Sequence, residues 1–537
     1  MKKIVTIRAG FIFFVTLWVA GAAVQSMAQI GNGLVSKKIT VPTSMKASPF
    51  NTDRSLSIPA DFEISVYARI NTARFMATTP DGNLLVSVPA EGKIKLVKSV
   101  SSGDPVVSDF ATGLTQPHDM VFHILHDTTF LYISEEAQIN RYVYHNGDLT
   151  AKNRKIVISN LPSISLPELK GAYSHRLKNI ALDKDHHLYV SIASSCNACA
   201  EDTKSDPVRG AMYVYNADGS NGRLFARGIR NSEGLDFIPG TNDLWAVVNN
   251  RDNIVYPYND NTGNYGKTIT SFVDNNPPEE FIHVTDGANF GWPFCNPDPR
   301  QGMDNMTFVR DYELNKDGTA ADCDKMTSIN KGIQAHSAPL GMLFLQNSAF
   351  PSHYKYAALV GLHGSWNRAV KTGYKVIYFP WDTTTQRPGG QIDLIRGFLN
   401  SDSSQVFGRP VDIAVSPQGD LFISDDYSGT IYKMHYVGFP TALDASGIAL
   451  KNSVTAYPQP AMKTMQVLLD YATGGDIKLT LTSLQGKEIF TLGQSVSQGE
   501  TILQLPAQSI PAGVYLLSVR KGNENNVQRV VIENCCD

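Results

Sequence analysis

The chain has 537 residues, enough for roughly two to four domains of ordinary size. Its 47 Lys and Arg nearly balance its 50 Asp and Glu, and this net charge of −3 argues against a nucleic-acid partner. A charged fraction of 18% and a hydrophobic fraction of 42% exclude an intrinsically disordered chain. The 42 Gly, 28 Pro and 22 Tyr point to a fold rich in turns and strands.

The N-terminus has the pattern of a secretory signal. Lys2, Lys3 and Arg8 precede an apolar run over residues 11–20, and small residues at Ser26 and Ala28 offer a cleavage site. The run is shorter than the ~20 residues that cross a bilayer. We therefore predict a signal peptide over residues 1–28 and a linker over 29–54, with no transmembrane segment after cleavage. An uncleaved anchor is the alternative.

Export places the six cysteines in an oxidising compartment. Cys196 and Cys199 could form a redox motif or half of a zinc site, but no second CxxC follows, which favours a local disulfide. Cys295 and Cys323 bracket a loop rich in Asp and Asn and are expected to staple it. The sequence assigns no role to Cys535 and Cys536.

A strand pattern recurs between residues 50 and 435. Turn residues lead into an alternating apolar strand, at residues 81–87, 129–134, 187–191, 242–247, 356–360 and 419–424. Partner strands follow most of these, at residues 93–97, 138–142, 211–215, 375–378 and 430–433. Repeated four-stranded units close into a β-propeller. We predict about six blades over residues 55–436; an irregular β-sandwich is the alternative.

The composition changes near residue 440. After a linker over 437–448, residues 449–537 contain six short apolar strands, no His and only scattered carboxylates. This pattern predicts a β-sandwich. The fold class is therefore all-β, a six-bladed β-propeller followed by a small β-sandwich domain.

The tail resembles the C-terminal sorting domain of the type IX secretion system. Tyr457-Pro-Gln-Pro460 stands where that family has Tyr-Pro-Asn-Pro, and Pro511-Ala-Gly-Val-Tyr515 matches its penultimate strand. The resemblance implies that the secretion machinery is a partner and that the protein is secreted or held at the cell surface.

Several loops that feed the predicted blades carry polar residues. His175 precedes the strand at 187–191, and a neutral imidazole there could act as a general base near pH 7. A histidine that only hydrogen-bonds within its loop is the alternative. Arg230 and Asn231, flanked by glycines, can present several donors to an anionic or carbonyl-bearing ligand.

Two further loops repeat this pattern. His363, Trp366 and Arg368 together offer a stacking and charge platform, and Arg409 precedes the last blade. Equivalent loops of a propeller converge on one mouth. We expect equivalent positions in different blades for His175, Arg230, Arg368 and Arg409. Several cations at one mouth would imply a polyanionic ligand there.

In these motifs the chain resembles the pyrroloquinoline-quinone (PQQ)-dependent sugar dehydrogenases, especially the sorbosone dehydrogenase-like branch. The resemblance covers residues 55–436. It rests on His175 with Lys178-Asn179, Gly228-Ile-Arg-Asn-Ser-Glu-Gly-Leu235, Gly287-Ala-Asn-Phe-Gly-Trp-Pro293, Ala335-His-Ser-Ala-Pro-Leu-Gly341, His363-Gly-Ser-Trp-Asn-Arg368 and Gly408-Arg-Pro-Val-Asp412.

The resemblance implies a PQQ cofactor, whose three carboxylates suit a ring of cations, and a calcium ion that polarises the quinone. It makes His175 the base that takes the sugar hydroxyl proton while hydride passes to PQQ. It implies cofactor contacts from Lys178, Arg230, Asn231, His363, Trp366, Arg368 and Arg409. Calcium is expected, partly through backbone carbonyls, at Asn250, Arg251 and Asp252, where the loop departs from the glucose enzymes.

The resulting hypothesis is an exported quinoprotein oxidoreductase that oxidises a sugar or aldose and passes electrons to an external acceptor. The first alternative is a propeller that binds carbohydrate or another ligand without catalysis, since fold does not fix function. A calcium-dependent lactonase is a second alternative, for which Glu233 and Asp412 would be the candidate carboxylates. Substrate specificity is expected to lie in the long insertions over residues 253–276 and 297–333.

Overall fold

The computed structural model describes residues 33–100, 103–346, 350–351, 354–437, 453–457, 461, 464–471, 473–483, 486–522 and 524–533. The predicted signal peptide, residues 438–448 of the predicted linker, Pro458 to Pro460 of the tail motif, Cys535 and Cys536 lie outside the described residues. Within the described part, none of the helices is long and apolar enough to span a membrane.

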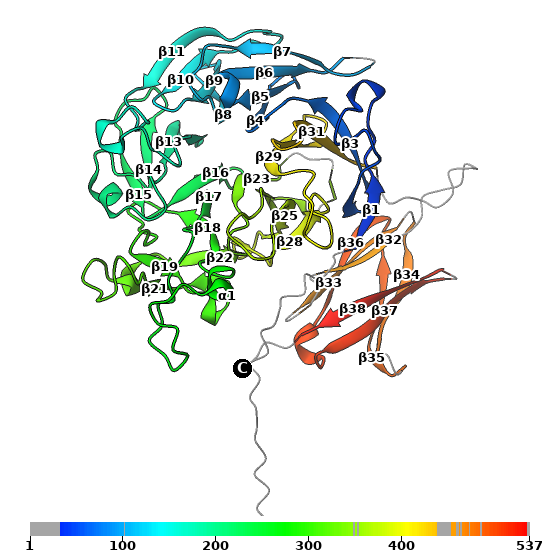
Figure 1. Ribbon diagram of the computed structural model, residues 1–537. Coiled ribbons are helices and arrows are strands. Elements are labelled where there is room, and N and C mark those ends of the chain that lie inside the picture. Colours follow the sequence, from blue (N-terminus) through cyan, green and yellow to red (C-terminus); the bar gives the residue numbers. More distant parts are fainter. Residues whose placement is uncertain are drawn as a thin grey trace, which may run out of the picture.

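Residues 62–436 fold into six antiparallel sheets arranged around a centre (Figure 1). The first three, each written from its innermost strand outward, are β4 (Met76–Thr78), β5 (Leu84–Val88), β6 (Lys93–Lys98) and β7 (Val106–Ala111); β8 (Met120–Leu125), β9 (Thr128–Ser134), β10 (Ile139–Val143) and β11 (Lys152–Ile158); β12 (Asn179–Leu182), β13 (His187–Ile192), β14 (Ala211–Asn216) and β15 (Arg223–Arg227).

The other three sheets follow the same order. They are β16 (Asn231–Phe237), β17 (Leu244–Asn249), β18 (Glu279–Val284), β22 (Ile329–Ile333) and β20 (Asp304–Met306); β23 (Pro339–Phe344), β24 (Ala358–Leu362), β25 (Lys375–Phe379) and β28 (Ile392–Ile395); β29 (Pro410–Val415), β30 (Leu421–Asp425), β31 (Thr430–Tyr436) and β3 (Phe62–Arg69). We number these sheets blades 1 to 6 in the order given.

The blades form a closed ring. The innermost strands β4, β8, β12, β16, β23 and β29 each contact the next, and β29 contacts β4. The last blade is completed by the N-terminal strand β3, which pairs with β31 so that Phe62 lies opposite Tyr436 and Arg69 opposite Thr430. Pairing the first strand of the ring, β3, with its last strand, β31, ties the two ends of the ring together. The predicted six-bladed propeller is confirmed.

The apolar core lies between the blades. Six clusters of buried side chains each combine residues from two neighbouring blades, including the closing pair of blades 6 and 1. Between blades 4 and 5, for example, the rings of Phe281 and Phe379 stack with centroids 4.8 Å apart. Because apolar surface is buried between blades, the axis of the ring is free to carry polar groups.

Three aspartates on the axis link alternate pairs of blades. Asp119, Asp236 and Asp412 precede or belong to the inner strands of blades 2, 4 and 6. Each accepts a hydrogen bond from a backbone N–H of the next blade's inner strand, from Ile180 at 2.9 Å, Phe344 at 2.7 Å and Met76 at 2.8 Å. Asp412, a candidate for the lactonase alternative, is therefore a buried structural bridge.

Part of the segment that we expected to be a linker over residues 29–54 is folded. The strand β1 (Leu34–Lys38) pairs with β2 (Ser55–Pro59), and Ile39 and Phe50 are buried in the core between blades 5 and 6. Large apolar side chains at these two positions explain why this segment packs instead of remaining extended.

Blade 4 carries the longest excursions, which lie at its outer side in Figure 1. They contain the α-helix α1 (Thr270–Val273) and the strand pair β19 (Cys295–Pro297) and β21 (Phe308–Arg310). The predicted disulfides Cys196–Cys199 and Cys295–Cys323 are both formed. A further hairpin on blade 5 consists of β26 (Trp381–Asp382) and β27 (Arg387–Pro388).

The tail forms two sheets that share one apolar core. One contains β32 (Ser453–Tyr457), β33 (Met465–Tyr471) and β36 (Gly499–Leu505), and the other contains β35 (Glu488–Val496), β34 (Gly475–Ser483), β37 (Gly513–Lys521) and β38 (Glu524–Ile532). Val467 and Leu503 of the first sheet pack in the same cluster as Leu479 and Leu517 of the second. The predicted β-sandwich is confirmed, with β32 as a strand that the sequence pattern did not predict.

Candidate functional site

The loops that carry the predicted site residues meet at one end of the propeller. Each inner strand begins at the end of the blade where its antiparallel neighbour, the second strand, finishes. Residues just before an inner strand and residues just after a second strand therefore reach the same end, which we call the mouth. Arg74, His118, Lys178, Arg230 and Arg409 stand within two residues of the start of an inner strand.

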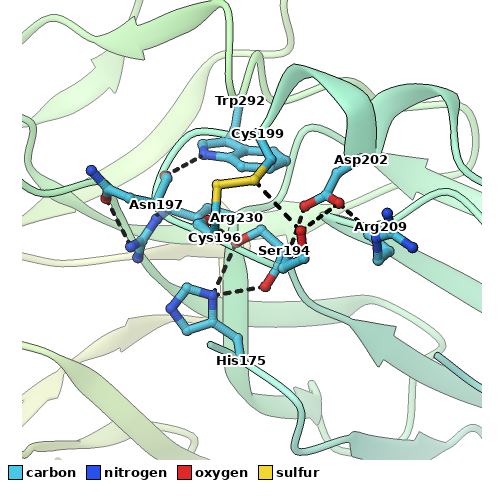
Figure 2. Close-up of a disulfide and its surroundings, with 10 residues drawn as sticks. His175, Ser194, Cys196, Asn197, Cys199, Asp202, Arg209, Arg230 and Trp292 are labelled. Carbon is cyan, nitrogen blue, oxygen red and sulfur yellow. Dashed lines mark hydrogen bonds and ion pairs between the residues drawn. A yellow bond between two sulfur atoms is a disulfide. The ribbon is translucent and has the colours of Figure 1, made fainter. Parts of the chain in front are cut away.

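His175 lies on the loop before β12 and is held by the loop that follows β13 (Figure 2). Its Nδ1 is 2.9 Å from the carbonyl oxygen of Ser194 and 3.0 Å from the Ser194 hydroxyl. Because a carbonyl can only accept, Nδ1 carries the proton and Nε2 keeps its lone pair. Burial, reinforced by the charge of Arg230, lowers the pKa of His175 to about 4. The imidazole is therefore neutral at pH 7, with a basic nitrogen available.

The loop that holds His175 rests on a buried ion pair. Asp202, which is fully buried, accepts hydrogen bonds from the backbone N–H and the hydroxyl of Ser195 and pairs with Arg209 at 2.6 Å. The Cys196–Cys199 disulfide closes the loop immediately beyond Ser195. These contacts fix the position of the Ser194 carbonyl and hence the tautomer of the histidine.

Asn197, at the tip of the disulfide loop, organises its surroundings. Its carbonyl oxygen accepts from Arg230 Nε at 3.0 Å and from Trp292 Nε1 at 3.2 Å, and its side-chain oxygen accepts from Arg230 Nη2 at 3.0 Å (Figure 2). Arg230 also donates to the carbonyl of Asn249 at 3.2 Å and lies 3.6 Å from Asp252. The guanidinium is thus held mainly by uncharged oxygens, and burial lowers its pKa.

On the other side of the mouth the polar groups form ion pairs. Arg74 contacts Glu233 at 3.0 Å and Asp426 at 2.8 Å, and Asp426 accepts from His363 at 2.8 Å. Arg74 precedes blade 1 while Glu233 belongs to blade 4, three blades away in a ring of six, so this ion pair crosses the channel. These residues form the floor of the channel. We call them the mouth cluster, which comprises Arg74, Glu233, His363 and Asp426.

The charges of the mouth cluster tune its carboxylates. Burial alone would raise the pKa of Glu233, but His118 and Arg74 together lower it. The same balance holds for Asp426, whose pKa is lowered by His363 and Arg74 against the effect of burial. His118 is fully buried beside Glu233, 3.5 Å from it, and burial lowers the pKa of the imidazole. Both carboxylates are therefore ionised at neutral pH.

The other predicted cofactor residues differ in their exposure. Asn231 is buried and donates to Glu233 at 3.3 Å. Lys178 is fully buried, donates to the carbonyl of Arg176 at 2.6 Å, and has its pKa lowered to about 7 by burial. Arg409 donates through Nε and Nη2 to the carbonyls of His363 and Gly364. Trp366 is 72% exposed.

Arg368 does not occupy a position equivalent to that of Arg230 and Arg409. It lies after β24, the second strand of blade 5, and donates to the carbonyl oxygens of Asp274, Ala335 and Val370. It therefore ties the loop of blade 5 to the insertion of blade 4.

The predicted calcium residues do not form a cage of oxygen ligands. Asn250 donates to Glu280 and to the carbonyl of Pro278, and Arg251 forms a buried ion pair with Asp311 and a second pair with the exposed Glu313. Asp252 presents a carboxylate, but Arg230 and His336 flank it at 3.6 Å and 3.4 Å. In the described ranges, no three His, Cys, Asp or Glu side chains lie close enough together to hold a metal ion.

A family profile described as TrAA12-like matches residues 56–437. The chain belongs to the TrAA12-like family. A second profile, described as a secretion system C-terminal sorting domain, matches residues 455–533 and marks the protein as secreted or held at the cell surface.

Curated relatives of this TrAA12-like chain include two proteins of different length. An uncharacterized protein of Borreliella burgdorferi is 25% identical over 393 residues, which cover 71% of this chain and 91% of the relative. The pyrroloquinoline quinone-dependent pyranose dehydrogenase of Coprinopsis cinerea is 23% identical over 333 residues, covering 54% of this chain but only 42% of that enzyme.

Solved structures show the same fold. A calcium structure of Trichoderma reesei carbohydrate-active enzymes family AA12 has a TM-score of 0.58 at 18% identity, covering 71% of this chain and 97% of that one. The holo form of the pyranose dehydrogenase PQQ domain from Coprinopsis cinerea has a TM-score of 0.57 at 19% identity, covering 71% and 96%. The propeller thus shares its fold with these two structures.

Three mouth residues escaped sequence reasoning: Arg74, His118 and Asp426. Arg74 and His118 precede inner strands, as Arg230 and Arg409 do, and the same positional rule applied to blades 1 and 2 would have found them. Asp426 directly follows β30, a strand that the sequence pattern did predict. The positions of these three residues next to the strands could thus have been predicted from the sequence. Their loops carry none of the motifs on which the site prediction rested.

Proposed function

We propose that this TrAA12-like chain is an exported PQQ-dependent dehydrogenase that oxidises a hydroxyl group of a sugar, with His175 as the proton acceptor. The observation that carries the proposal is the state of His175. Its Nδ1 proton is committed to a main-chain carbonyl, and Nε2 makes no hydrogen bond within the described residues. A neutral, oriented imidazole is the group that general base catalysis at pH 7 requires.

The donors of the mouth suit a ligand with several carboxylates. Arg74 and Arg409 approach from different blades, and the buried Nε of Arg74 has no hydrogen-bond partner among the described residues. Arg409 commits Nε and Nη2 to carbonyls, which leaves Nη1 for a ligand. Guanidinium groups bind carboxylates through paired N–H groups. In this proposal Arg74, Arg230, Asn231 and Arg409 hold the quinone.

When bound, PQQ would supply a hydride acceptor for the sugar carbon, held by Arg74, Arg230, Asn231 and Arg409. His175 Nε2 removes the proton from the hydroxyl on that carbon, and the Ser194 carbonyl stabilises the imidazolium that results by accepting from Nδ1. The fixed tautomer ensures that Nε2, and not Nδ1, meets the substrate.

Calcium takes no step in this mechanism, because Asn250, Arg251 and Asp252 are occupied by contacts within the protein. A calcium ion at Asp252 would have to compete with the guanidinium of Arg230 and the imidazole of His336. Our calcium prediction therefore depends on backbone carbonyls, of which that of Asn249 already accepts from Arg230 and that of Asp252 from Asn197.

A dye-reduction assay tests the proposal. The purified full chain is incubated with PQQ, with and without calcium, and then supplied with a panel of pyranoses and a redox dye. We expect dye reduction with at least one sugar only after PQQ is added. Sugar binding in calorimetry without dye reduction under any condition would instead support the non-catalytic carbohydrate-binding propeller.

A further inference from the structure

A cavity of about 360 Å³ lies outside the mouth, between the two insertions of blade 4. Its size falls within the range of small-molecule sites, about 300–1,000 Å³. One insertion contributes Asn259 and Tyr265, and the other contributes Arg310, Tyr312, Lys316 and Asp322. Neither insertion takes part in the mouth cluster, so the cavity has no role in the chemistry derived above.

Two tyrosines form a corner of this cavity. The rings of Tyr265 and Tyr312 have centroids 5.0 Å apart and planes at 85°. Lys316 lies beside both, with Nζ 3.1 Å from the Tyr312 hydroxyl and 5.3 Å from the Tyr265 ring centre. Perpendicular aromatic walls with polar groups at their rims offer both stacking surface and hydrogen-bond partners.

The cavity is built from fixed parts. The Cys295–Cys323 disulfide holds one wall, since Cys323 itself lines the cavity. The backbone of Gly266 packs so closely on Tyr312 that a Cβ at this position would lie 2.4 Å from the tyrosine hydroxyl. Gly266 also has a φ of +75°, which other residues rarely adopt. Such a preformed pocket loses little entropy when a ligand binds.

An ion-pair network, centred on the buried Arg251, joins the cavity wall to the mouth. Arg251, 3% exposed, pairs with Asp311 and with Glu313, the two residues on either side of Tyr312. Asp311 also accepts from the backbone N–H groups of Glu313 and Leu314, which shapes the turn that presents Tyr312. The next residue after Arg251 is Asp252, a partner of Arg230 at the mouth. These contacts hold the cavity wall in a fixed position relative to the mouth.

We propose that this cavity binds a sugar unit of an oligosaccharide or polysaccharide other than the unit that is oxidised, with Tyr265 and Tyr312 as its walls. The inference rests on the proposed function and extends it to the substrate class. The C–H faces of a pyranose ring pack on the electron-rich faces of tyrosine rings, and its hydroxyls suit the amide and charged groups of the lining. The lining carries both charge signs, as Arg310 and Lys316 face Asp322 and Asp324, which favours a neutral ligand over an anion.

A sugar unit in this cavity lies away from the reacting carbon. Its binding can therefore stabilise the transition state only for substrates long enough to reach both places. We therefore expect kcat/KM for dye reduction to rise with chain length from one to six sugar units. The probes are glucose, xylose and mannose with their β-1,4-linked oligomers, tested on the full chain loaded with PQQ. Calorimetry on the chain without cofactor gives a second readout that does not depend on turnover.

Tyr312→Ala removes one wall and Tyr312→Phe removes only the hydroxyl. We expect the alanine variant to bind the oligomers about tenfold more weakly, the scale of one aromatic contact, and to lose the dependence on chain length. Its kcat/KM for the monosaccharide should equal that of the wild type. Tyr67→Ala, which removes a half-buried tyrosine of blade 6 that bonds Ser99 and packs on Phe422, serves as the matched control, and thermal melts confirm that each variant is folded.

The outcomes separate the two proposals. Oligomer binding that depends on Tyr312, without dye reduction, would retain the cavity site and overturn the dehydrogenase. Dye reduction with a kcat/KM independent of chain length, or oligomer binding that Tyr312→Ala leaves unchanged, would overturn the cavity site and retain the dehydrogenase.

Discussion

The two sides of the mouth position polar groups by different means. Beside blades 3 and 4, His175 and Arg230 are held by uncharged oxygens of Ser194, Asn197 and Asn249. Beside blades 1, 5 and 6, Arg74 and His363 are held by the ionised carboxylates of the mouth cluster. Oxygens of the main chain do not titrate, so the first side keeps its geometry across a wide pH range, whereas the second depends on charge.

This difference indicates which side of the mouth serves proton transfer and which side serves ligand binding. The proton acceptor His175 has uncharged nearest partners, and burial together with the charge of Arg230 lowers its pKa although Glu233 and Asp252 act to raise it. A group that holds an anionic ligand benefits from being fixed by counter-charges while it retains unused N–H groups. The following predictions test this division, beginning with the largest effect.

Replacing the base should have the greatest effect. We expect His175→Ala to lower kcat about 10²- to 10⁴-fold while PQQ still binds. Ser194→Ala is the matched control, because it keeps the carbonyl that fixes Nδ1, and it should lose less than threefold, a bound of about 0.7 kcal/mol. With a pKa of about 4, His175 is in its basic form above that value, so kcat/KM should be level from about pH 5 to 7 and fall below pH 4. A profile that falls near pH 6.5 would contradict this account.

Removing the central cation should destabilise the ion-paired side. Arg74→Met leaves Glu233 and Asp426 without their shared partner in a half-enclosed channel. We expect the free energy of unfolding to fall by roughly 3 kcal/mol, measured by urea denaturation. Arg74→Lys retains the charge, and its free energy of unfolding should fall by clearly less. Equal losses would show that packing of the side chain, and not its charge, matters here.

Truncating the side chain of Asn197, at the tip of the disulfide loop, should affect ligand binding more than folding. Asn197→Ala keeps the carbonyl but removes the side-chain oxygen that holds Arg230 Nη2. We expect PQQ to bind about tenfold more weakly, the cost of one charge-assisted hydrogen bond. Fluorescence titration would measure it. Asn242→Ala, on an exposed turn bonded to Asp185, is the control and should leave the affinity unchanged.

The smallest effect is a pair of opposite pH trends in stability. The pKa of Glu233 is lowered, so its contribution is present above the ordinary glutamate range and lost as the pH falls. Glu233→Gln should therefore cost more stability at pH 7 than at pH 3. The pKa of Asp236 is raised to about 6 by burial, so its contribution is lost as the pH rises. Asp236→Asn should become more favourable relative to wild type between pH 4 and 7. Parallel trends in melting temperature would contradict the assignment.

The sequence pattern identified the second strand of every blade and the third strand of all but blade 4, because turn residues precede mainly apolar runs in these strands. β5, β24 and β30 are buried at every residue. Among the inner strands, which the pattern did not identify, β4 has three residues, too few for a period of two to be read. The local CxxC spacing likewise sufficed to predict the Cys196–Cys199 disulfide.

Side-chain roles at the mouth depended on contacts that no local pattern contains. Arg251 stands next to Asp252 in sequence but pairs with Asp311, sixty positions along the chain, and so turns away from the predicted calcium position. Arg74 and Glu233 meet only because the ring closes and places blades 1 and 4 across the channel. Sequence reasoning could name the loops of the mouth, but the pairing within it follows from closure of the propeller.

The most direct test of the central claim is a single-turnover experiment on the PQQ-loaded full chain. Wild type and His175→Ala are loaded with PQQ to the same level without an electron acceptor, and a pyranose that supports dye reduction is then added. We predict that the absorbance of the quinone bleaches rapidly in wild type and at least 100-fold more slowly in His175→Ala. Equal bleaching rates, or a wild-type chain that fails to bind PQQ, would contradict the account.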